Sequence, residues 1–174
     1  GGQLRFLNVT GEGAFSVETD ISESFIDYRP AVIDASANLG GVDLTFDYHD
    51  DNVLFIGSQG DDHFNIGDDW IEGDITIDLS AGGRNYIEVE DGEHVLITGS
   101  NANSFYSVEY ADTLELNAGS ADDQVYIGSY VQKAVVNLGQ GDNAIYVEEM
   151  DEASILEITA GSGDNKMFIA EAYY

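Results

Sequence analysis

A short segment of the form Gly-x-Asp/Asn-x-apolar-x-Ile/Val recurs along the chain at a nearly constant spacing. Six copies are clear, and they begin at Gly60, Gly83, Ala102, Ala121, Gly141 and Gly163. Successive copies therefore start 23, 19, 19, 20 and 22 residues apart. Because a unit of about 20 residues is too short to bury an apolar face by itself, a repeat of this period predicts a solenoid, in which stacked coils share one core.

A second apolar pattern lies between these copies, where apolar side chains occupy alternate positions. Its members are Ile75, Ile77 and Leu79, Val95 and Ile97, Leu114 and Leu116, Val136 and Leu138, and Leu156 and Ile158. Alternation of this kind is typical of a strand with one face on a core and the other in water. Each repeat is thus expected to contain a strand, a bend, a second strand and a Gly-rich turn. The predicted fold class is all-β: a right-handed parallel β-solenoid of the β-helix or β-roll kind, with about eight coils of roughly 19–24 residues.

Two other fold classes compete with the solenoid. Helices are excluded, because no segment sustains the i, i+3, i+4, i+7 apolar spacing and 20 glycines interrupt every candidate. A β-sandwich of hairpins remains the rival. It requires strands of alternating direction, whereas identical units with one turn type in register favour parallel stacking.

The whole chain, residues 1–174, is expected to form a single solenoid domain. Residues 57–174 carry the regular repeats, and residues 1–56 hold degenerate N-terminal coils. In that N-terminal part, residues 11–17 fit the template loosely, and a further coil is expected near residues 35–39. The chain opens with two glycines and no methionine or apolar signal region, which indicates a processed or trimmed piece of a larger product.

The charge of the chain excludes several partners. Against 34 Asp and Glu there are 5 Lys and Arg, so the formal net charge is −29. Nucleic acid is excluded as a partner because phosphate binding needs clustered basic residues. Membrane insertion is not expected, because no apolar stretch approaches the roughly 20 residues that a spanning helix needs. The absence of cysteine excludes disulfides and zinc–thiolate sites.

Stacking of the coils predicts two columns of polar side chains at the Gly-rich turn. Coils of a solenoid lie about 4.8 Å apart, so equivalent residues form ladders. The first column contains Asp61, Arg84, Asn103, Asp122, Asp142 and Asp164. The second column contains Asp62, Asn85, Ser104, Asp123, Asn143 and Asn165.

These columns are the candidate metal site. Carboxylates in one column repel unless a cation lies between them, and carboxylate, amide and carbonyl oxygens together suit calcium better than zinc or copper. The predicted ligands are Asp61, Asp62, Asp122, Asp123, Asp142, Asn143, Asp164 and Asn165. Two alternatives stay open: Asp and Asn beside Gly are ordinary turn formers whose ladders need no ion, and a dense acidic surface also suits a halophilic protein.

Residues 57–65 resemble the calcium-binding nonapeptide G-G-x-G-x-D-x-(apolar)-x of RTX (repeats-in-toxin) β-roll proteins, and fail only at the second glycine. Residues 118–126 keep the ligand aspartate at Asp123, whereas Asn143 and Asn165 stand where the family has aspartate. There is one nonapeptide per coil here, not two in tandem, and the match covers about a quarter of the chain. The resemblance implies a secreted bacterial protein with calcium held between successive turns.

An aromatic column is expected on the solvent side of the first strand of each repeat. The column contains Asn65, Glu88, Ser107, Tyr126, Tyr146 and Phe168, so its last three members are aromatic. Tyr126, Tyr146 and Phe168 are the predicted partner-binding surface, for another protein or a sugar ring. The alternative is a cross-strand ladder that shields backbone hydrogen bonds and adds about 0.2–1 kcal/mol per pair.

No catalytic site is expected. His49, His63 and His94 show no triad spacing, the basic residues that a uronate lyase needs are dispersed, and paired acids carry no information among 34. The predicted function is a non-catalytic, acidic structural or adhesive element of an extracellular cell surface or filament, stabilised by calcium. It is expected to associate end to end or to continue into a longer fibre, and to contact a carbohydrate or surface protein. The alternative is a carbohydrate-active β-helix enzyme, such as a polysaccharide lyase or hydrolase, or its accessory module.

Overall fold

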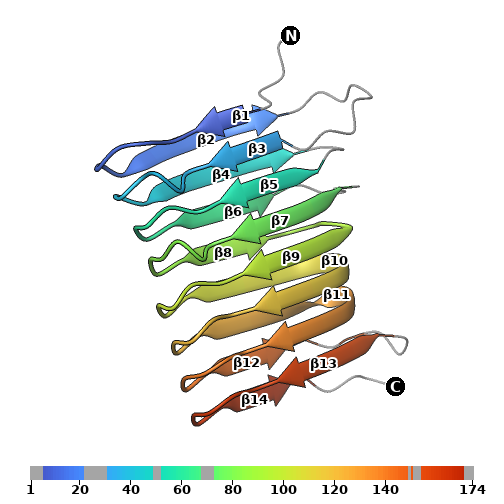
Figure 1. The fold of residues 1–174 in the computed structure, drawn as a ribbon. Helices are drawn as coiled ribbons and strands as arrows, with labels where there is room; N and C mark the ends of the chain where they lie inside the picture. The colour runs from blue at the N-terminus through green and yellow to red at the C-terminus, as the bar shows by residue number, and fades with distance from the viewer. Residues whose placement is uncertain are drawn as a thin grey trace.

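The computed structural model describes residues 6–21, 31–48, 52–67, 73–148, 150 and 154–170. These residues form strands, turns and bends in a parallel β-solenoid (Figure 1). They include no helix, and accordingly none that is long and apolar enough to cross a membrane. The predicted fold class is confirmed, and the β-sandwich is excluded because every strand pairing in the described part of the chain is parallel.

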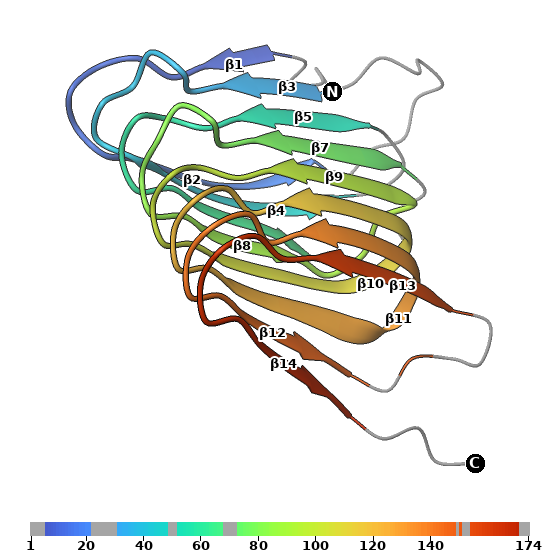
Figure 2. The same cartoon turned by 60° about the horizontal axis from the view of Figure 1, so that its bottom comes forward.

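The strands lie on two faces of the solenoid, which Figure 2 shows as two layers joined at their sides. One face contains β1 (Phe6–Asn8), β3 (Ala31–Asp34), β5 (Val53–Ile56), β7 (Asp74–Asp78), β9 (His94–Thr98) and β13 (Ile155–Thr159). The other contains β2 (Phe15–Ile21), β4 (Val42–Tyr48), β6 (His63–Gly67), β8 (Tyr86–Val89), β12 (Ala144–Val147) and β14 (Lys166–Ile169). The long strands β10 (Phe105–Asn117) and β11 (Gln124–Asn137) curve from one face to the other.

Each coil follows the predicted order of strand, bend, strand and Gly-rich turn. The register also agrees with the repeat alignment, because Asn65 pairs with Glu88, Glu88 with Ser107, and Ser107 with Tyr126. Because of this register, equivalent residues form straight columns along the solenoid axis. We call the two sides of the solenoid the turn side, where the Gly-rich turns lie, and the bend side, where β10 and β11 curve.

The number of coils and the register of the first coil differ from expectation. The solenoid has about six turns, slightly fewer than the eight predicted. Its end strands β1 and β14 each pair on one side only within the described residues. The loose copy in residues 11–17 is displaced by two positions: Phe15 pairs with Val42, which is level with Asp62 because Asp43 pairs with His63. A displacement of two positions keeps the same side chains of β2 on the same face, so the period-two alternation of the sequence could not reveal it.

Apolar side chains from both faces fill one continuous core. The rings of Phe55 and Phe64 stack across it with centroids 4.6 Å apart. Tyr106 is buried in the same core, and its hydroxyl donates a hydrogen bond to the carbonyl oxygen of Ala118 at 3.1 Å. Alternate residues of each strand point inward, which is why a period of two was readable in the sequence.

The glycines of the turns let neighbouring coils approach closely. Gly83 has φ +74° and Gly119 has φ +121°, a region that favours glycine. A Cβ atom at Gly83 would lie 1.7 Å from the carbonyl oxygen of Gly60, and one at Gly119 would lie 1.7 Å from that of Ser100. The turns are thus packed backbone against backbone, with no room for a side chain between them.

Candidate functional site

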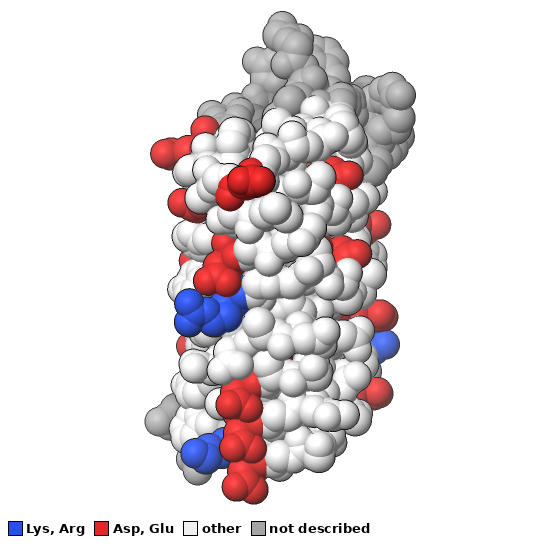
Figure 3. Space-filling model, turned by 60° about the vertical axis from the view of Figure 1, so that its left-hand side comes forward, with Lys and Arg blue, Asp and Glu red and all other residues white. Residues whose placement is uncertain are grey.

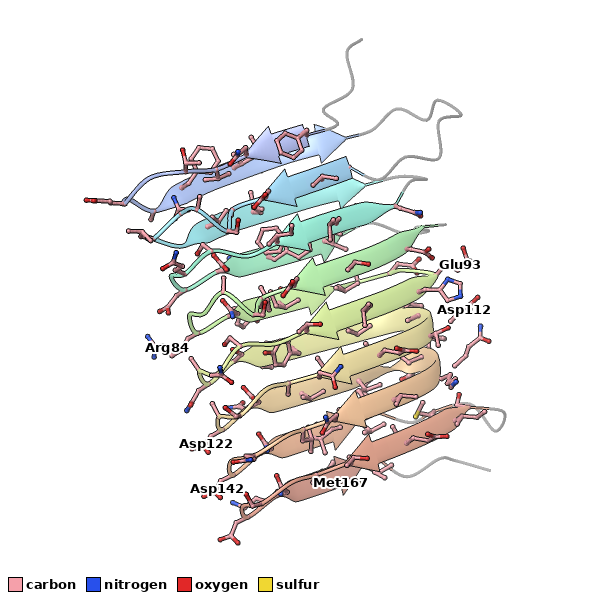
Figure 4. The ribbon with its side chains drawn as sticks, viewed as in Figure 1. Arg84, Glu93, Asp112, Asp122, Asp142 and Met167 are labelled. Atoms are coloured by element: carbon pink, nitrogen blue, oxygen red, sulfur yellow. The ribbon has the colours of Figure 1, made fainter. Side chains whose placement is uncertain are left out.

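The first column lies on the outer surface of the turn side. Its members are exposed, and Figure 4 shows Arg84, Asp122 and Asp142 projecting from this edge. Backbone N–H groups link successive members of this column to the carboxylates: the N–H of Asp142 donates to Oδ1 of Asp122 at 2.8 Å, and the N–H of Asp164 donates to Oδ1 of Asp142 at 2.7 Å. Asp61 accepts the Arg84 N–H at 2.8 Å and pairs with its guanidinium at 3.3 Å. A row of acidic side chains follows this edge near the C-terminal end (Figure 3).

The second column is buried and forms a hydrogen-bonded ladder inside the turns. In each step the backbone N–H of one member donates to a side-chain oxygen of its equivalent in the next coil. The steps are Asp62 to Asn85 (3.0 Å), Asn85 to Ser104 (3.1 Å), Ser104 to Asp123 (2.8 Å), Asp123 to Asn143 (2.8 Å) and Asn143 to Asn165 (3.3 Å). At five successive contacts between coils, a backbone N–H is thus hydrogen-bonded to a side-chain oxygen.

The structure separates the eight predicted metal ligands into two groups. Asp61, Asp122, Asp142 and Asp164 face solvent on the first column. Asp62, Asp123 and Asn143 are buried on the second column, and Asn165 is partly buried. Because adjacent residues of an extended chain point to opposite sides, the two groups cannot surround one ion.

The first column is the part that fits calcium. In Asp122 and Asp142, one carboxylate oxygen accepts a backbone N–H, so the other carboxylate oxygen is available to a cation. The turn backbone contributes little, because its carbonyls are engaged between coils, as in the 2.7 Å bond from Gly161 N–H to Gly139 oxygen. An ion there would be held by carboxylates of two successive coils and by water.

Two buried aspartates of the second column have different surroundings. Both oxygens of Asp62 are satisfied: Oδ1 accepts the Val42 N–H at 2.9 Å and the Ser58 hydroxyl at 2.6 Å, and Oδ2 accepts the Ser58 N–H at 2.8 Å. Asp123 is 1% exposed, its Oδ1 accepts the Ser104 N–H, and its Oδ2 has no hydrogen-bond partner among the described residues.

This difference controls the charge of the two carboxyl groups. Burial raises the pKa of Asp62 above its usual value, and the donors from Ser58 and Val42 oppose that rise. Burial raises the pKa of Asp123 to about 7, opposed by the backbone of Ser104 and reinforced by the neighbouring Asp122. The neutral form of Asp123 is favoured because it avoids a buried charge, and Oδ2 has no hydrogen-bond donor among the described residues that would stabilise the carboxylate.

The aromatic column is present as expected, but its rings are stacked face to face. Tyr126 and Tyr146 have centroids 5.5 Å apart and an interplanar angle of 4°, and Tyr146 and Phe168 have 5.0 Å and 11°. Burial raises the pKa of the Tyr126 phenol, and the hydrogen bond between Tyr126 and Glu148 raises it further. Both faces of the Tyr146 ring are covered by its neighbours in the stack. The two end rings each have one face that no ring of the column covers, and Phe168 is 58% exposed whereas Tyr126 lies next to Ser107.

Two shallow grooves lie beside these columns on the same face. One, of about 290 Å³, has the side chains of Phe105, Tyr126, Tyr146 and Phe168 around Ala144. The other, of about 500 Å³, lies where the first column loses its acids, and it is lined by residues that include Asp61, Arg84, Asn103, Asp122 and Tyr86. The second groove is the more polar of the two, because acidic side chains, the Arg84 guanidinium and aromatic rings line it together.

Sequence analysis missed one group of candidate ligands on the bend side. Asp74, Glu93 and His94 have ligand atoms that all lie within 4.8 Å of one another, the one such triple among the described residues. The interval of 20 residues between Asp74 and His94 equals the repeat period, so aligning the second strands as columns would have found the pair.

Comparisons of this chain with protein-family models, with curated proteins and with solved structures give no significant match.

Proposed function

We propose that this chain is a non-catalytic structural or adhesive element of an extracellular surface or fibre, in which calcium ions bridge acidic side chains of successive coils. The observation that carries this proposal is the register of Asp122, Asp142 and Asp164 on three consecutive coils at one exposed edge. Their mutual repulsion favours a bound cation, and a chain with net charge −29 concentrates cations at its surface. The resemblance of residues 57–65 to the RTX nonapeptide supports the same ion and a secreted protein.

A structural role is supported by the surfaces that the coils present. The second column is satisfied by hydrogen bonds over five successive contacts, and the core is continuous, so successive coils form one regular rod. The two grooves are shallow and open, and neither would enclose a ligand. A rod with regular faces suits the spacing or adhesive function of a fibre better than the enclosed site that catalysis requires.

Association along the solenoid axis is part of this proposal. In the described part of the chain β14 pairs only with β12 and β13 only with β11, so their outer edges are free to pair. Met167 and Ile169 stand in the core columns of Ile145 and Val147 and are each 52% exposed. Unpaired backbone over an apolar surface is a template for more strands, which come either from continuation of the fibre or from a second copy.

The test of the calcium proposal is thermal unfolding of the chain in millimolar calcium against a chelator, with magnesium as the matched divalent control. Calcium that binds the folded state and not the unfolded chain increases the free energy of unfolding by mass action, by about 2.7 kcal/mol at a hundred times Kd, and so raises the Tm. The expected result is a higher Tm in calcium than in an equal concentration of magnesium. Identical melting curves in calcium, magnesium and chelator would contradict the proposal.

A carbohydrate-binding or carbohydrate-active role is the second candidate, and the polar groove of about 500 Å³ favours it. Arg84 there is a cation for a uronate carboxylate, and Asp61 and Asp122 lie on either side of it in the first column. Titration with uronic-acid oligosaccharides, with an Arg84→Gln variant as control, tests this role. Binding that disappears in the variant would support it, and absence of binding would remove it.

A further inference from the structure

Three side chains that can bind a metal converge on the bend side, away from the two polar columns. They come from the start of β7, where Asp74 lies, and from the start of β9, where His94 follows Glu93. The Nδ1 atom of His94 lies 2.8 Å from Oδ1 of Asp74, and ligand atoms of all three residues lie within 4.8 Å of one another. Figure 4 shows Glu93 on the edge opposite to Asp122 and Asp142.

The backbone that carries these side chains is hydrogen-bonded to neighbouring coils. Glu93 donates its N–H to the carbonyl oxygen of Gly73 at 3.1 Å and accepts the Thr113 N–H at 3.0 Å. The Asp74 N–H donates to Oδ1 of Asn52 at 2.9 Å, and Asp74 pairs with His94 in the register of β7 and β9. A site built on sheet backbone fixed on both sides loses little freedom when it binds an ion.

The donor set differs from that of the first column because it includes a ring nitrogen. One imidazole nitrogen and two carboxylates are ligands that zinc accepts, with water completing a four-coordinate site, whereas calcium takes six to eight oxygen atoms. Two carboxylates and a neutral imidazole also balance the charge of a divalent ion. We propose that Asp74, Glu93 and His94 form a surface binding site for a zinc ion that joins two successive coils.

The chain contains a natural control for this site. His63 and Asp43 form the same kind of pair across β4 and β6, with Nδ1 3.0 Å from Oδ1 of the aspartate. The residue before His63 is Asp62, which is buried and hydrogen-bonded to Ser58 and Val42, so it cannot turn outward to act as the third ligand. The two sites therefore differ by one carboxylate, which is Glu93.

Zinc at this site has a structural consequence. The ion would be bound by residues of two coils, so it would stabilise the contact between β7 and β9 in addition to their backbone hydrogen bonds. It acts on the bend side, whereas calcium acts on the turn side, and so the two ions should stabilise the chain independently. This separation also makes the zinc proposal independent of the proposed function.

The experiment is an isothermal titration of the whole chain with zinc chloride at pH 7.5, in excess magnesium that occupies weak carboxylate sites. The wild type is compared with His94→Ala, Glu93→Gln, His63→Ala and His49→Ala, the last of which lies outside the described residues. The proposal predicts one zinc ion per chain. Affinity should fall at least about tenfold in His94→Ala and in Glu93→Gln, because losing a ligand costs no less than losing an outer-shell partner, and it should stay unchanged in the other two.

Cobalt absorption spectra give a second readout that does not depend on heat of binding. Cobalt bound by the wild type should give visible bands from a site of low symmetry, and His94→Ala should give the spectrum of hydrated cobalt. Circular dichroism without metal checks that the variants fold, which is expected because all three side chains are exposed. Absence of a one-to-one complex, an equal loss in His63→Ala, or an unchanged affinity in Glu93→Gln would overturn the proposal.

Discussion

The first and second columns contain residues that are adjacent in the chain and similar in type, yet they have opposite environments. Asp122 is exposed and its Oδ1 accepts the backbone N–H of Asp142, whereas Asp123 is buried and its Oδ2 has no partner among the described residues. Alternation along an extended strand is enough to cause this, because it sends one residue to water and the next to the interior. An acidic motif at a turn therefore contains two chemically different sets of side chains, and only the outer set is accessible to a hydrated cation.

The inner set also varies along its length, and we expect the largest effect there. Replacing Asp62 by alanine leaves the N–H groups of Val42 and Ser58 without an acceptor, and the Ser58 hydroxyl keeps only the Gly60 carbonyl oxygen at 3.4 Å. At about 1–3 kcal/mol for each buried unsatisfied donor, the free energy of unfolding should fall by about 3 kcal/mol or more. Urea denaturation at pH 8 without calcium measures this loss.

The matched control is Asp123→Ala, because Asp123 accepts one backbone N–H, that of Ser104. Alanine leaves that one N–H without its acceptor but also removes the buried charge of Asp123, so at pH 8 the loss of stability should be no more than about 1 kcal/mol. Equal losses for the two variants would show that the number of donors does not distinguish the two aspartates.

A smaller effect with the opposite sign is expected for Asp123→Asn. The pKa of Asp123 is about 7 in the folded chain against an ordinary value of 3.8, so between these pH values the folded state keeps a proton that the unfolded chain releases. Stability is therefore lost as the pH rises through this window, and the loss is complete above it. An asparagine removes this penalty, and its amide can donate to turn carbonyls as Asn143 does to Gly141 at 3.2 Å.

Asp123→Asn should consequently raise the free energy of unfolding by about 1–3 kcal/mol at pH 8, and the gain should shrink toward pH 4. Urea denaturation across this pH range checks it. Asp62→Asn is the control, because its new amide would face the Ser58 N–H donor and lower the stability. A gain that is independent of pH would mean that Asp123 is ionised throughout the range.

The smallest effect is expected on the first column. In Asp142→Asn the amide oxygen can still accept the Asp164 N–H, so without calcium the stability should change by no more than about 0.5 kcal/mol. In calcium the wild type should gain more than the variant, since the variant has lost one carboxylate. Melting curves of both proteins with and without calcium test this, and an equal gain would show that Asp142 does not contribute to calcium binding.

Much of the fold could be predicted because glycine and apolar positions recur in every coil. Gly83 and Gly119 mark turns where a Cβ atom has no room, and the apolar alternation in β6 and β7 identifies the inward positions. The same rules were insufficient in the first coil, where the glycines and apolar residues of 11–17 fit the template but the actual register lies two positions away, a shift that leaves the alternation unchanged.

The candidate site was less predictable, for two physical reasons. Stacking equivalent residues gave the members of both columns correctly, but it treated neighbours such as Asp122 and Asp123 as one ligand set. The partner of Asp62 lies four residues before it, at Ser58, and the equivalent position before Asp123 is Gly119, which has no hydroxyl. The group around His94 was missed because the template covered the turn side only.

Native mass spectrometry with calcium tests most directly the central claim that cations belong to the first column. The wild type should carry bound calcium that a chelator removes. A variant with Asp122, Asp142 and Asp164 all changed to asparagine should lose this calcium, whereas Asp123→Asn should retain all of it. Calcium that persists in the triple variant, or that is lost in Asp123→Asn, would contradict the account.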